Sequence, residues 1–165
     1  MIQIRSEQPG DHATIYDITK RAFAPMPFAD GDEQDLINKL RNAGALAISL
    51  VAEQDHAVIG HIAFSPAFAE DGSAGWYALG PVAVEPARQK QGIGGQLIRA
   101  GIEELRKRDA AGCVLVGNPA IYGRFGFALA PELAPSGHPA EYFQILPLRI
   151  AAPNAVVNFH PLFEG

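Results

Sequence analysis

The amino-acid sequence predicts an α+β fold built on a mixed, mostly antiparallel sheet that is flanked by helices. Helical repeats of apolar residues alternate along the chain with short apolar runs that are typical of strands. Two of these runs are separated by a short polar turn, which indicates an antiparallel hairpin. One strong helical repeat lies between two further strand-like runs, and this order is typical of a crossover between parallel strands.

The length of 165 residues predicts one domain over residues 1–165, since such a chain buries roughly 70% of its unfolded surface. Apolar residues make up 48% and charged residues 19%, as in globular proteins. The longest apolar stretch, 43–52, is interrupted by Ser49 and is shorter than the ~20 residues of a membrane-spanning helix. We therefore expect no membrane partner and a cytoplasmic location.

The cysteine content indicates the cellular compartment, and the net charge indicates the class of partner. The single cysteine, Cys113, excludes an intrachain disulfide and fits a reducing compartment. The net charge of −5 argues against nucleic acid as a partner, because a basic surface supplies most of the energy of such binding. Small molecules or cationic groups are the expected partners.

The first 45 residues predict one strand and two helices. Apolar residues alternate with polar ones at 2–4, which indicates a strand. A turn at 9–11 begins a helix whose apolar repeat continues to Phe23. A loop at 24–35 precedes a second helical repeat, and Gly44 is the expected end of that helix.

The middle of the chain predicts three strands. The runs 47–53 and 58–65 form the hairpin, and a third strand follows at Trp76–Val84. Gly80 and Pro81 lie inside this third strand, and proline cannot donate a hydrogen bond to a ladder. We therefore expect a central strand pair that splays apart at this point.

The second half of the chain begins with the clearest helix, from Gly92 onward, because its apolar residues follow one face. The apolar run Cys113–Val116 predicts a buried strand beside it. A short helix at 119–125 and strands at 142–150 and 156–159 complete the prediction.

The segment Leu79–Leu97 indicates an anion site. It runs from a strand through a basic turn into the clearest helix, and it enters that helix through three glycines: Gly92, Gly94 and Gly95. Where side chains are missing, the free N–H groups of the first helical turn can point at phosphate oxygens. Arg88 and Lys90 add positive charge in an otherwise acidic chain. The pattern predicts a pyrophosphate site; the alternative is an ordinary helix start.

Two familiar nucleotide motifs are missing from this segment. The dinucleotide pattern G-x-G-x-x-G needs a glycine where the chain has Leu97, and G-x-x-x-x-G-K-[ST] occurs nowhere. The remaining pattern, Gln89-x-x-Gly92-x-Gly94, resembles the acyl-coenzyme A signature Q/R-x-x-G-x-G/A of the GNAT superfamily of N-acyltransferases.

The resemblance covers most of the chain. Val82–Pro86 and Tyr122–Phe127 are similar to GNAT segments in the same order, and the stretches VIGHIAFSP, IYGRFGF and FHPLF resemble the YhbS-like branch of predicted N-acetyltransferases. The resemblance implies a single-domain GNAT-like fold, acetyl-coenzyme A as cosubstrate, and direct transfer of the acetyl group to an amine acceptor in a ternary complex.

The resemblance also implies roles for individual residues. Val82, Ala83 and Val84 would bind the pantetheine arm through their backbone groups, as an added strand pairs with a sheet. The pyrophosphate would be held by the following turn: Gln89, Lys90, Gln91, Gly92, Ile93, Gly94 and Gly95. Tyr122 would protonate the departing thiolate, with a packed aromatic as the alternative. Asn118 is a further candidate for contact with the coenzyme.

A general base is harder to assign. Relatives often place a carboxylate on the strand before the coenzyme motif, but residues 76–82 contain none. His61 is the best side-chain candidate because imidazole titrates in the useful range, although strand histidines are often structural and a water is the alternative base. The five histidines show no metal-ligand spacing, so no metal site is expected.

The loop before the second helix carries four acidic residues and no basic one: Asp30, Asp32, Glu33 and Asp35. These charges either attract a cationic amine acceptor or favour the start of the helix, with Asp32 as its cap. The sequence does not identify the acceptor, and it does not decide between an acetyl donor and a longer acyl donor. It also leaves open a non-catalytic acyl-coenzyme A sensor and a homodimer.

Overall fold

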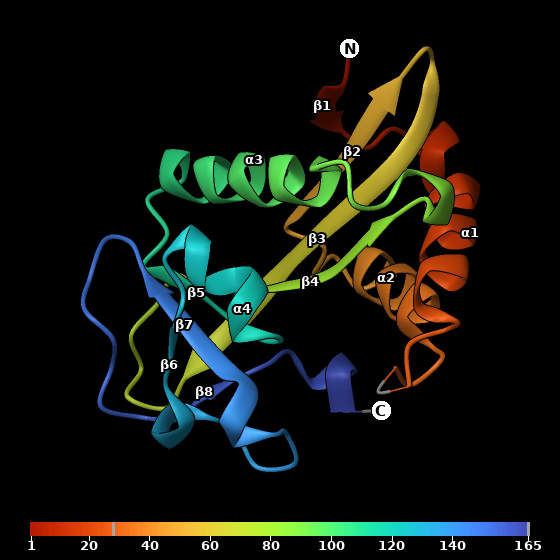
Figure 1. Ribbon diagram of the computed structural model, residues 1–165. Helices are drawn as coiled ribbons and strands as arrows, with labels where there is room; N and C mark the ends of the chain where they lie inside the picture. The colour runs from red at the N-terminus through yellow and green to blue at the C-terminus, as the bar shows by residue number, and fades with distance from the viewer. Residues whose placement is uncertain (28, 165) are drawn as a thin grey trace. The chain divides into compact units, whose positions relative to one another are not determined.

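The computed structural model describes residues 1–27 and 29–164 (Figure 1). Backbone contacts divide the chain into two compact units. The first unit contains residues 1–64 and 80–102, and the second contains residues 65–79 and those from 103 onward. Phe28, which belongs to the predicted loop 24–35, lies outside the described residues.

Three antiparallel strands and two helices build most of the first unit. Strand β1 (Gln3–Ser6) pairs with β2 (Ile48–Gln54), which pairs with β3 (Ala57–Ala69). Helices α1 (His12–Phe23) and α2 (Glu33–Asn42) lie side by side (Figure 1). They pack on β2 through one apolar cluster: Ile15, Ile37 and Val51.

The hairpin between β2 and β3 turns through two residues, Asp55 and His56, whose φ angles are 53° and 66°. Two positive φ angles in a two-residue loop are typical of a type I′ turn, whose twist matches that of the strands. The predicted hairpin is therefore confirmed. Strand β3 continues four residues beyond the predicted end at Ser65, across Pro66, which sequence reasoning treats as a strand breaker.

Strand β4 has the predicted bounds, Trp76–Val84. Its parallel ladder with β5 (Gly112–Val116) runs from the pair Trp76 and Gly112 to the pair Ala78 and Val114. This ladder ends ahead of Gly80 and Pro81, so the predicted splaying of the pair is confirmed.

The second unit contains further strand pairs. Strand β5 pairs antiparallel with β7 (Phe143–Pro147), and β7 pairs with β6 (Ala128–Leu129). Strand β8 (Val157–Asn158) pairs with the last residues of β3. Large side chains fill its core, with Trp76, Phe143 and Phe159 in one apolar cluster. Sequence reasoning missed β6, because two residues are too short to show a period.

Two more helices and six short 3₁₀ segments complete the described part of the chain. Helix α3 is Ile93–Lys107, and α4 is Pro119–Tyr122. The 3₁₀ segments are η1 (Pro9–Asp11), η2 (Pro86–Arg88), η3 (Gly123–Phe125), η4 (Pro131–Leu133), η5 (Ala140–Tyr142) and η6 (Pro161–Glu164). The chain passes from one unit to the other within β3, β4 and α3.

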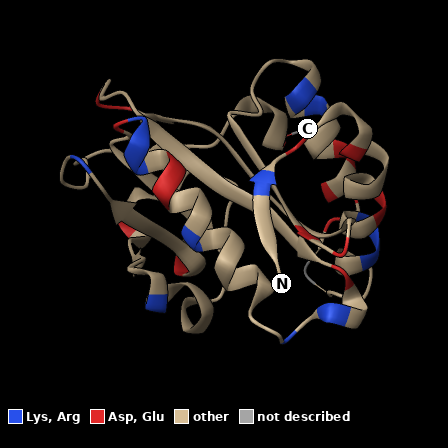
Figure 2. Cartoon of the chain, turned by 90° about the horizontal axis from the view of Figure 1, so that it is seen from above, with Lys and Arg blue, Asp and Glu red and all other residues tan. Residues whose placement is uncertain are grey.

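The architecture confirms the predicted α+β class, with mostly antiparallel strands, the parallel pair β4 and β5, and flanking helices. Basic positions are interspersed with acidic positions over the chain (Figure 2). Among the described residues, none of the helices combines the length and the apolar character needed to cross a membrane.

Candidate active site

The candidate coenzyme strand is the end of β4, in the first unit. Ala83 is 3% exposed and packs against Ile18 and Ala22 of α1, whereas Val82 and Val84 are half-buried. This alternation follows the period of a strand, which turns successive side chains to opposite faces. The strand is tied to its neighbour at its end, where the Glu85 N–H donates to the Ile59 carbonyl at 2.8 Å.

The turn after β4 contains two left-handed residues, Lys90 (φ 65°) and Gly92 (φ 83°). Left-handed backbone is costly for a residue with a side chain, and such residues are concentrated at binding sites. Helix α3 begins directly after this turn with Ile93, whose side chain is buried, followed by Gly94 and Gly95. The N–H groups of these three residues have no acceptor in an earlier helical turn.

Glycine at 92 and 94 is not required by packing inside the protein. A Cβ built on Gly92 would have nothing within 4 Å, and one on Gly94 would meet only Val84 Cγ2, at 3.8 Å. The missing side chains therefore leave open space in front of a helix N-terminus. Such a position, with its free N–H groups and positive end of the helix dipole, can bind a phosphate group.

Side chains from α1 and β2 hold this turn. Arg21 of α1 donates two hydrogen bonds to the Glu85 carboxylate and thereby lowers the pKa of Glu85. Arg88 donates to Gln54 of β2 and, at 3.3 Å, to Gln91. Both partners are neutral amide oxygens, so these hydrogen bonds orient the guanidinium and leave its positive charge in place.

Gln89 and Lys90 behave differently from one another. The Gln89 side-chain amide donates to the Val84 carbonyl at 3.1 Å, which connects the turn to the strand before it. Lys90 is exposed, and none of the described residues forms an ion pair with it. The two cations predicted for the anion site thus both keep their positive charge: Arg88 is held by hydrogen bonds, and Lys90 is exposed.

The second unit places Asn118 and Tyr122 at the two ends of α4. The Asn118 side-chain oxygen accepts the Ala120 N–H at 2.9 Å and so caps the helix. The Tyr122 ring meets Phe127 edge-on at 6.1 Å. Burial raises the pKa of Tyr122, and the neighbouring Cys113 raises it further. The phenol therefore keeps its proton at neutral pH and can act as a proton donor.

Cys113 has no catalytic geometry. Its side chain is fully buried in β5, and burial raises the pKa of the thiol well above its ordinary value. A thiol that is both inaccessible and protonated is a poor nucleophile.

His61, the candidate general base, is fully buried in the first unit. Its Nε2 lies 2.7 Å from the Ser49 hydroxyl, which donates to Glu7 at 2.5 Å. Glu7 in turn accepts two hydrogen bonds from Arg41, each of 2.8 Å. The Ser49 hydroxyl has a single hydrogen, so His61 Nε2 is the protonated nitrogen and Nδ1, which has no partner, is the bare acceptor.

Burial lowers the pKa of His61 to about 4. The imidazole is therefore neutral and weakly basic at neutral pH, and it has no access to solvent. These properties favour the structural interpretation of His61 over a role as general base.

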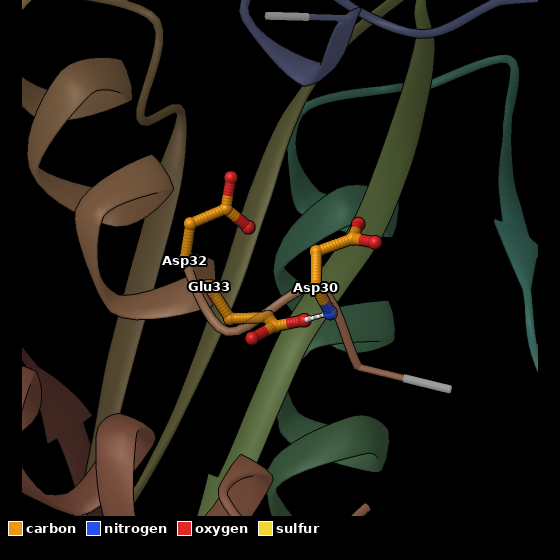
Figure 3. Close-up of side chains that lie close together, drawn as sticks. All are labelled: Asp30, Asp32 and Glu33. Carbon is orange, nitrogen blue, oxygen red and sulfur yellow. Dashed lines mark hydrogen bonds between the residues drawn. The ribbon is translucent and has the colours of Figure 1, made fainter. Parts of the chain in front are cut away.

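The side chains of Asp30, Asp32 and Glu33 lie close together at the start of α2 (Figure 3). Each of Asp30, Asp32 and Glu33 places a carboxylate oxygen within 4.8 Å of the other two. The Glu33 carboxylate accepts the backbone N–H groups of Asp30 and Gly31, at 2.8 and 3.2 Å. Asp32 occupies the N-cap position without a side-chain hydrogen bond to the helix, so the expected cap is not formed.

The predicted residues thus fall into two groups. Residues 82–84 at the end of β4 and residues 89–95, which lead into α3, form one group in the first unit. Asn118 and Tyr122 form the second group. Sequence reasoning missed the residues that hold each group: Arg21 and Gln54 in the first, and Gly117 with Gln144 in the second. The one signal for Gln144 is a polar residue within the apolar strand FQILP.

Comparison with known proteins identifies the family. The model of the acetyltransferase (GNAT) family matches residues 12–127. YhbS of Escherichia coli K12, described as an uncharacterized N-acetyltransferase, is 37% identical over 128 residues, covering 77% of this chain and 74% of YhbS.

Two solved structures are similar over nearly the whole chain. A GNAT family acetyltransferase from Brucella melitensis in complex with acetyl-CoA has a TM-score of 0.88 and 45% identity, covering 99% of this chain and 98% of its own. YhbS from E. coli in complex with CoA also has a TM-score of 0.88, with 32% identity and coverage of 99% and 92%. The chain belongs to the GNAT family of acetyltransferases.

Proposed function

We propose that this chain transfers the acetyl group of acetyl-coenzyme A directly onto a primary amine, without a covalent enzyme intermediate. The open N-terminus of α3, where Gly92 and Gly94 leave space that the protein does not fill, carries this proposal. The pyrophosphate of the coenzyme would accept N–H groups from residues 93–95, with Lys90 beside it. The acetyl-CoA in the Brucella structure and the CoA in the YhbS structure support the same cosubstrate.

The pantetheine arm would pair with the backbone of residues 82–84. Proline at 81 has no N–H group, and the ladder between β4 and β5 ends at Ala78. An amide-containing arm can add to a strand whose backbone groups are unpaired, much as an extended peptide adds to a sheet edge. Asn118 would serve this arrangement by holding the start of α4 and, through it, Tyr122.

The chemical step needs a proton donor and a proton acceptor. A neutral amine attacks the thioester carbonyl, and the tetrahedral intermediate then expels the thiolate of coenzyme A. The Tyr122 phenol would donate its proton to this sulfur as charge develops on it. No carboxylate lies on β4, and His61 is neutral and buried, so a water is the proposed acceptor of the amine proton.

A cationic amine is the proposed class of acceptor. The side chains of Asp30 and Asp32 are exposed and carry no hydrogen bond to the helix, so their charges are directed to solvent. A concentration of one charge attracts ligands of the opposite sign. Glu33 differs from both, because its carboxylate organises the loop backbone.

The proposal is tested by mixing the protein with acetyl-coenzyme A and measuring free thiol release with a panel of amines: a polyamine, amino acids, an aminoglycoside and a lysine-containing peptide. The expected result is thiol release that depends on one class of amine, together with a mass increase of that amine by one acetyl group. Succinyl-coenzyme A in a parallel assay separates an acetyl donor from a longer one.

Thermal unfolding with and without acetyl-coenzyme A separates the alternatives. A protein that is stabilised by the coenzyme but releases no thiol with any amine would be an acyl-coenzyme A sensor. A protein that is not stabilised at all would contradict the coenzyme site itself.

A further inference from the structure

The β5–α4 turn holds the Tyr122 ring by a contact that only glycine permits. Gly117 directly follows β5, and a Cβ built on it would lie 2.6 Å from Tyr122 Cε2 and 3.0 Å from Tyr122 Cδ2. Non-bonded carbon atoms pack at about 3.5–4.0 Å, so any side chain at 117 must displace this ring. The φ angle of Gly117 is not positive, and its backbone conformation is therefore open to other residues. Glycine is therefore required at position 117 because a larger residue would clash with the Tyr122 ring, and not because of its backbone conformation.

Gln144 holds the same turn from the neighbouring strand. Its side chain is fully buried, and its amide nitrogen donates to the Gly117 carbonyl at 2.8 Å. The Gly117 N–H donates to the carbonyl of Tyr142, the residue before β7, at 3.1 Å, so both backbone groups of Gly117 are hydrogen-bonded. The Gln144 side-chain oxygen has no partner. A buried polar side chain is costly, which indicates that its position serves a purpose that an apolar residue would not.

A short series of contacts connects Gly117 to Tyr122. Asn118 follows Gly117, caps α4 and accepts the Tyr122 N–H through its carbonyl at 3.2 Å. The Tyr122 ring lies next to the position that a Cβ on Gly117 would take and meets the Phe127 ring edge-on. Backbone and ring of Tyr122 are both located relative to Gly117.

We infer that Gly117 and Gln144 are positioning residues that set the place of the Tyr122 hydroxyl in the transfer reaction. This inference rests on the proposed role of Tyr122 as proton donor. Proton transfer requires the donor oxygen within hydrogen-bond distance of the acceptor, so a displaced ring would lose the transfer while the coenzyme site in the first unit stays unchanged.

The test is a double-mutant cycle of Gly117→Ala and Tyr122→Phe, with the turnover number measured on an accepted amine. Phenylalanine keeps the ring, and hence its clash with a methyl group at position 117, but it removes the hydroxyl. We expect Gly117→Ala to lower turnover by about tenfold or more in the wild-type background and by less than about twofold in the Tyr122→Phe background. The Michaelis constant for acetyl-coenzyme A should stay nearly constant.

Gly123→Ala is the matched control, because it adds the same methyl group next to Tyr122 where a Cβ meets nothing within 4 Å. This variant should keep wild-type turnover. Gln144→Leu, which removes the donor to Gly117 with little change in volume, should lower turnover in the same direction and likewise only when the Tyr122 hydroxyl is present. Gln144→Leu replaces Gly117→Ala in the double-mutant cycle if circular dichroism shows that Gly117→Ala does not fold.

The outcomes separate this inference from the proposed function. If Tyr122→Phe keeps wild-type turnover while chemistry limits the rate, the role of Tyr122 is wrong and the inference fails with it. If Tyr122→Phe loses activity but Gly117→Ala and Gln144→Leu do not, or lower it equally in both backgrounds, the positioning role alone is overturned.

Discussion

At Gly94 the protein leaves space that its own packing does not use. A Cβ would fit there with 3.8 Å to its nearest neighbour, and an acidic residue in the first turn of a helix is favourable for the helix itself. A change at this residue should therefore act on ligand binding more than on folding, which makes Gly94 the sharpest single test of the pyrophosphate site.

We expect acetyl-coenzyme A at a thousandfold excess over its dissociation constant to stabilise the wild-type protein by ~4 kcal/mol. Gly94→Glu should abolish this stabilisation, because its carboxylate would occupy the approach to the helix N-terminus and repel phosphates. Thermal unfolding with and without coenzyme measures the effect. Gly10→Glu, at another exposed glycine with open space around it, is the control for added charge. A coenzyme-dependent rise in the melting temperature of Gly94→Glu would show that the pyrophosphate binds elsewhere.

Tyr122 is the residue whose side chain is the proposed proton donor. Its raised pKa means that the phenol remains protonated across neutral and mildly alkaline pH. Tyr122→Phe should accordingly lower turnover by ~10²-fold or more, while coenzyme affinity changes little. Steady-state kinetics from about pH 6 to about pH 9 measure both quantities. Wild-type turnover throughout this range, with chemistry rate-limiting, would make Tyr122 a packed aromatic.

At the scale of elements, the loop before α2 and the turn before α3 are organised in different ways. The turn before α3 is held by side chains from α1 and β2, through Arg21 and Gln54. The loop before α2 is held by Glu33, which binds the backbone of the loop itself. Asp30 and Asp32 are left to face solvent, so their charge can be removed without loss of these contacts.

We expect Asp30→Asn combined with Asp32→Asn to raise the Michaelis constant of a cationic acceptor several-fold and to leave that of acetyl-coenzyme A nearly unchanged. Added salt should have a similar effect on the wild type, because exposed charges are screened over ~10 Å at about 0.1 M ionic strength. Glu103→Gln with Glu132→Gln changes the net charge by the same amount at other exposed positions. Equal acceptor constants in the two double variants would leave the loop acids as helix-start residues only.

At the scale of the whole molecule, buried ionisable groups make stability depend on pH. Burial raises the pKa of Glu7, but hydrogen bonds from Arg41 and Ser49 outweigh it, so this pKa lies below its ordinary value. A hydrogen bond from Arg5 lowers the pKa of Asp11 in the same way. Both carboxylates stabilise the folded state above their ordinary pKa, and this contribution is lost as the pH falls through the folded pKa.

Protonation of His61 affects the stability of the fold at higher pH than protonation of the two carboxylates. Its pKa is about 4 in the folded chain against 6.5 for the ordinary group, so the unfolded chain binds more protons between these values. Stability is full above about pH 6.5 and should fall by about 3 kcal/mol on acidification to about pH 4.

We expect His61→Gln to remove most of this loss, because glutamine can still donate to Ser49 but does not titrate. Urea unfolding at a series of pH values measures the free energy of unfolding of each variant. His56→Asn, a change at an exposed histidine, is the control. Below about pH 4 the variant and the wild type should lose stability together as the carboxylates protonate. An unchanged slope for His61→Gln between about pH 6.5 and about pH 4 would show that His61 is not the titrating group.

The sequence by itself determined the features that depend on local order along the chain. The bounds of β4, the order of the helices, the hairpin between β2 and β3 and the glycine turn all follow from the spacing of nearby residues, and the same turn indicated the family. Hydrophobic periods and glycine positions act within a few residues, so they can be recognised without knowledge of the fold.

The tertiary structure alone decided what surrounds each of these residues. His61 changed from a candidate base to a buried neutral group, bound to Ser49 at 12 positions' distance along the chain, and Ser49 is in turn bound to Glu7. Gln144 reaches Gly117 across 27 positions of the chain, and Arg88 meets Gln54 across 34. Burial and pKa depend on such distant partners, and no spacing along the chain records which strands and helices will bring them together.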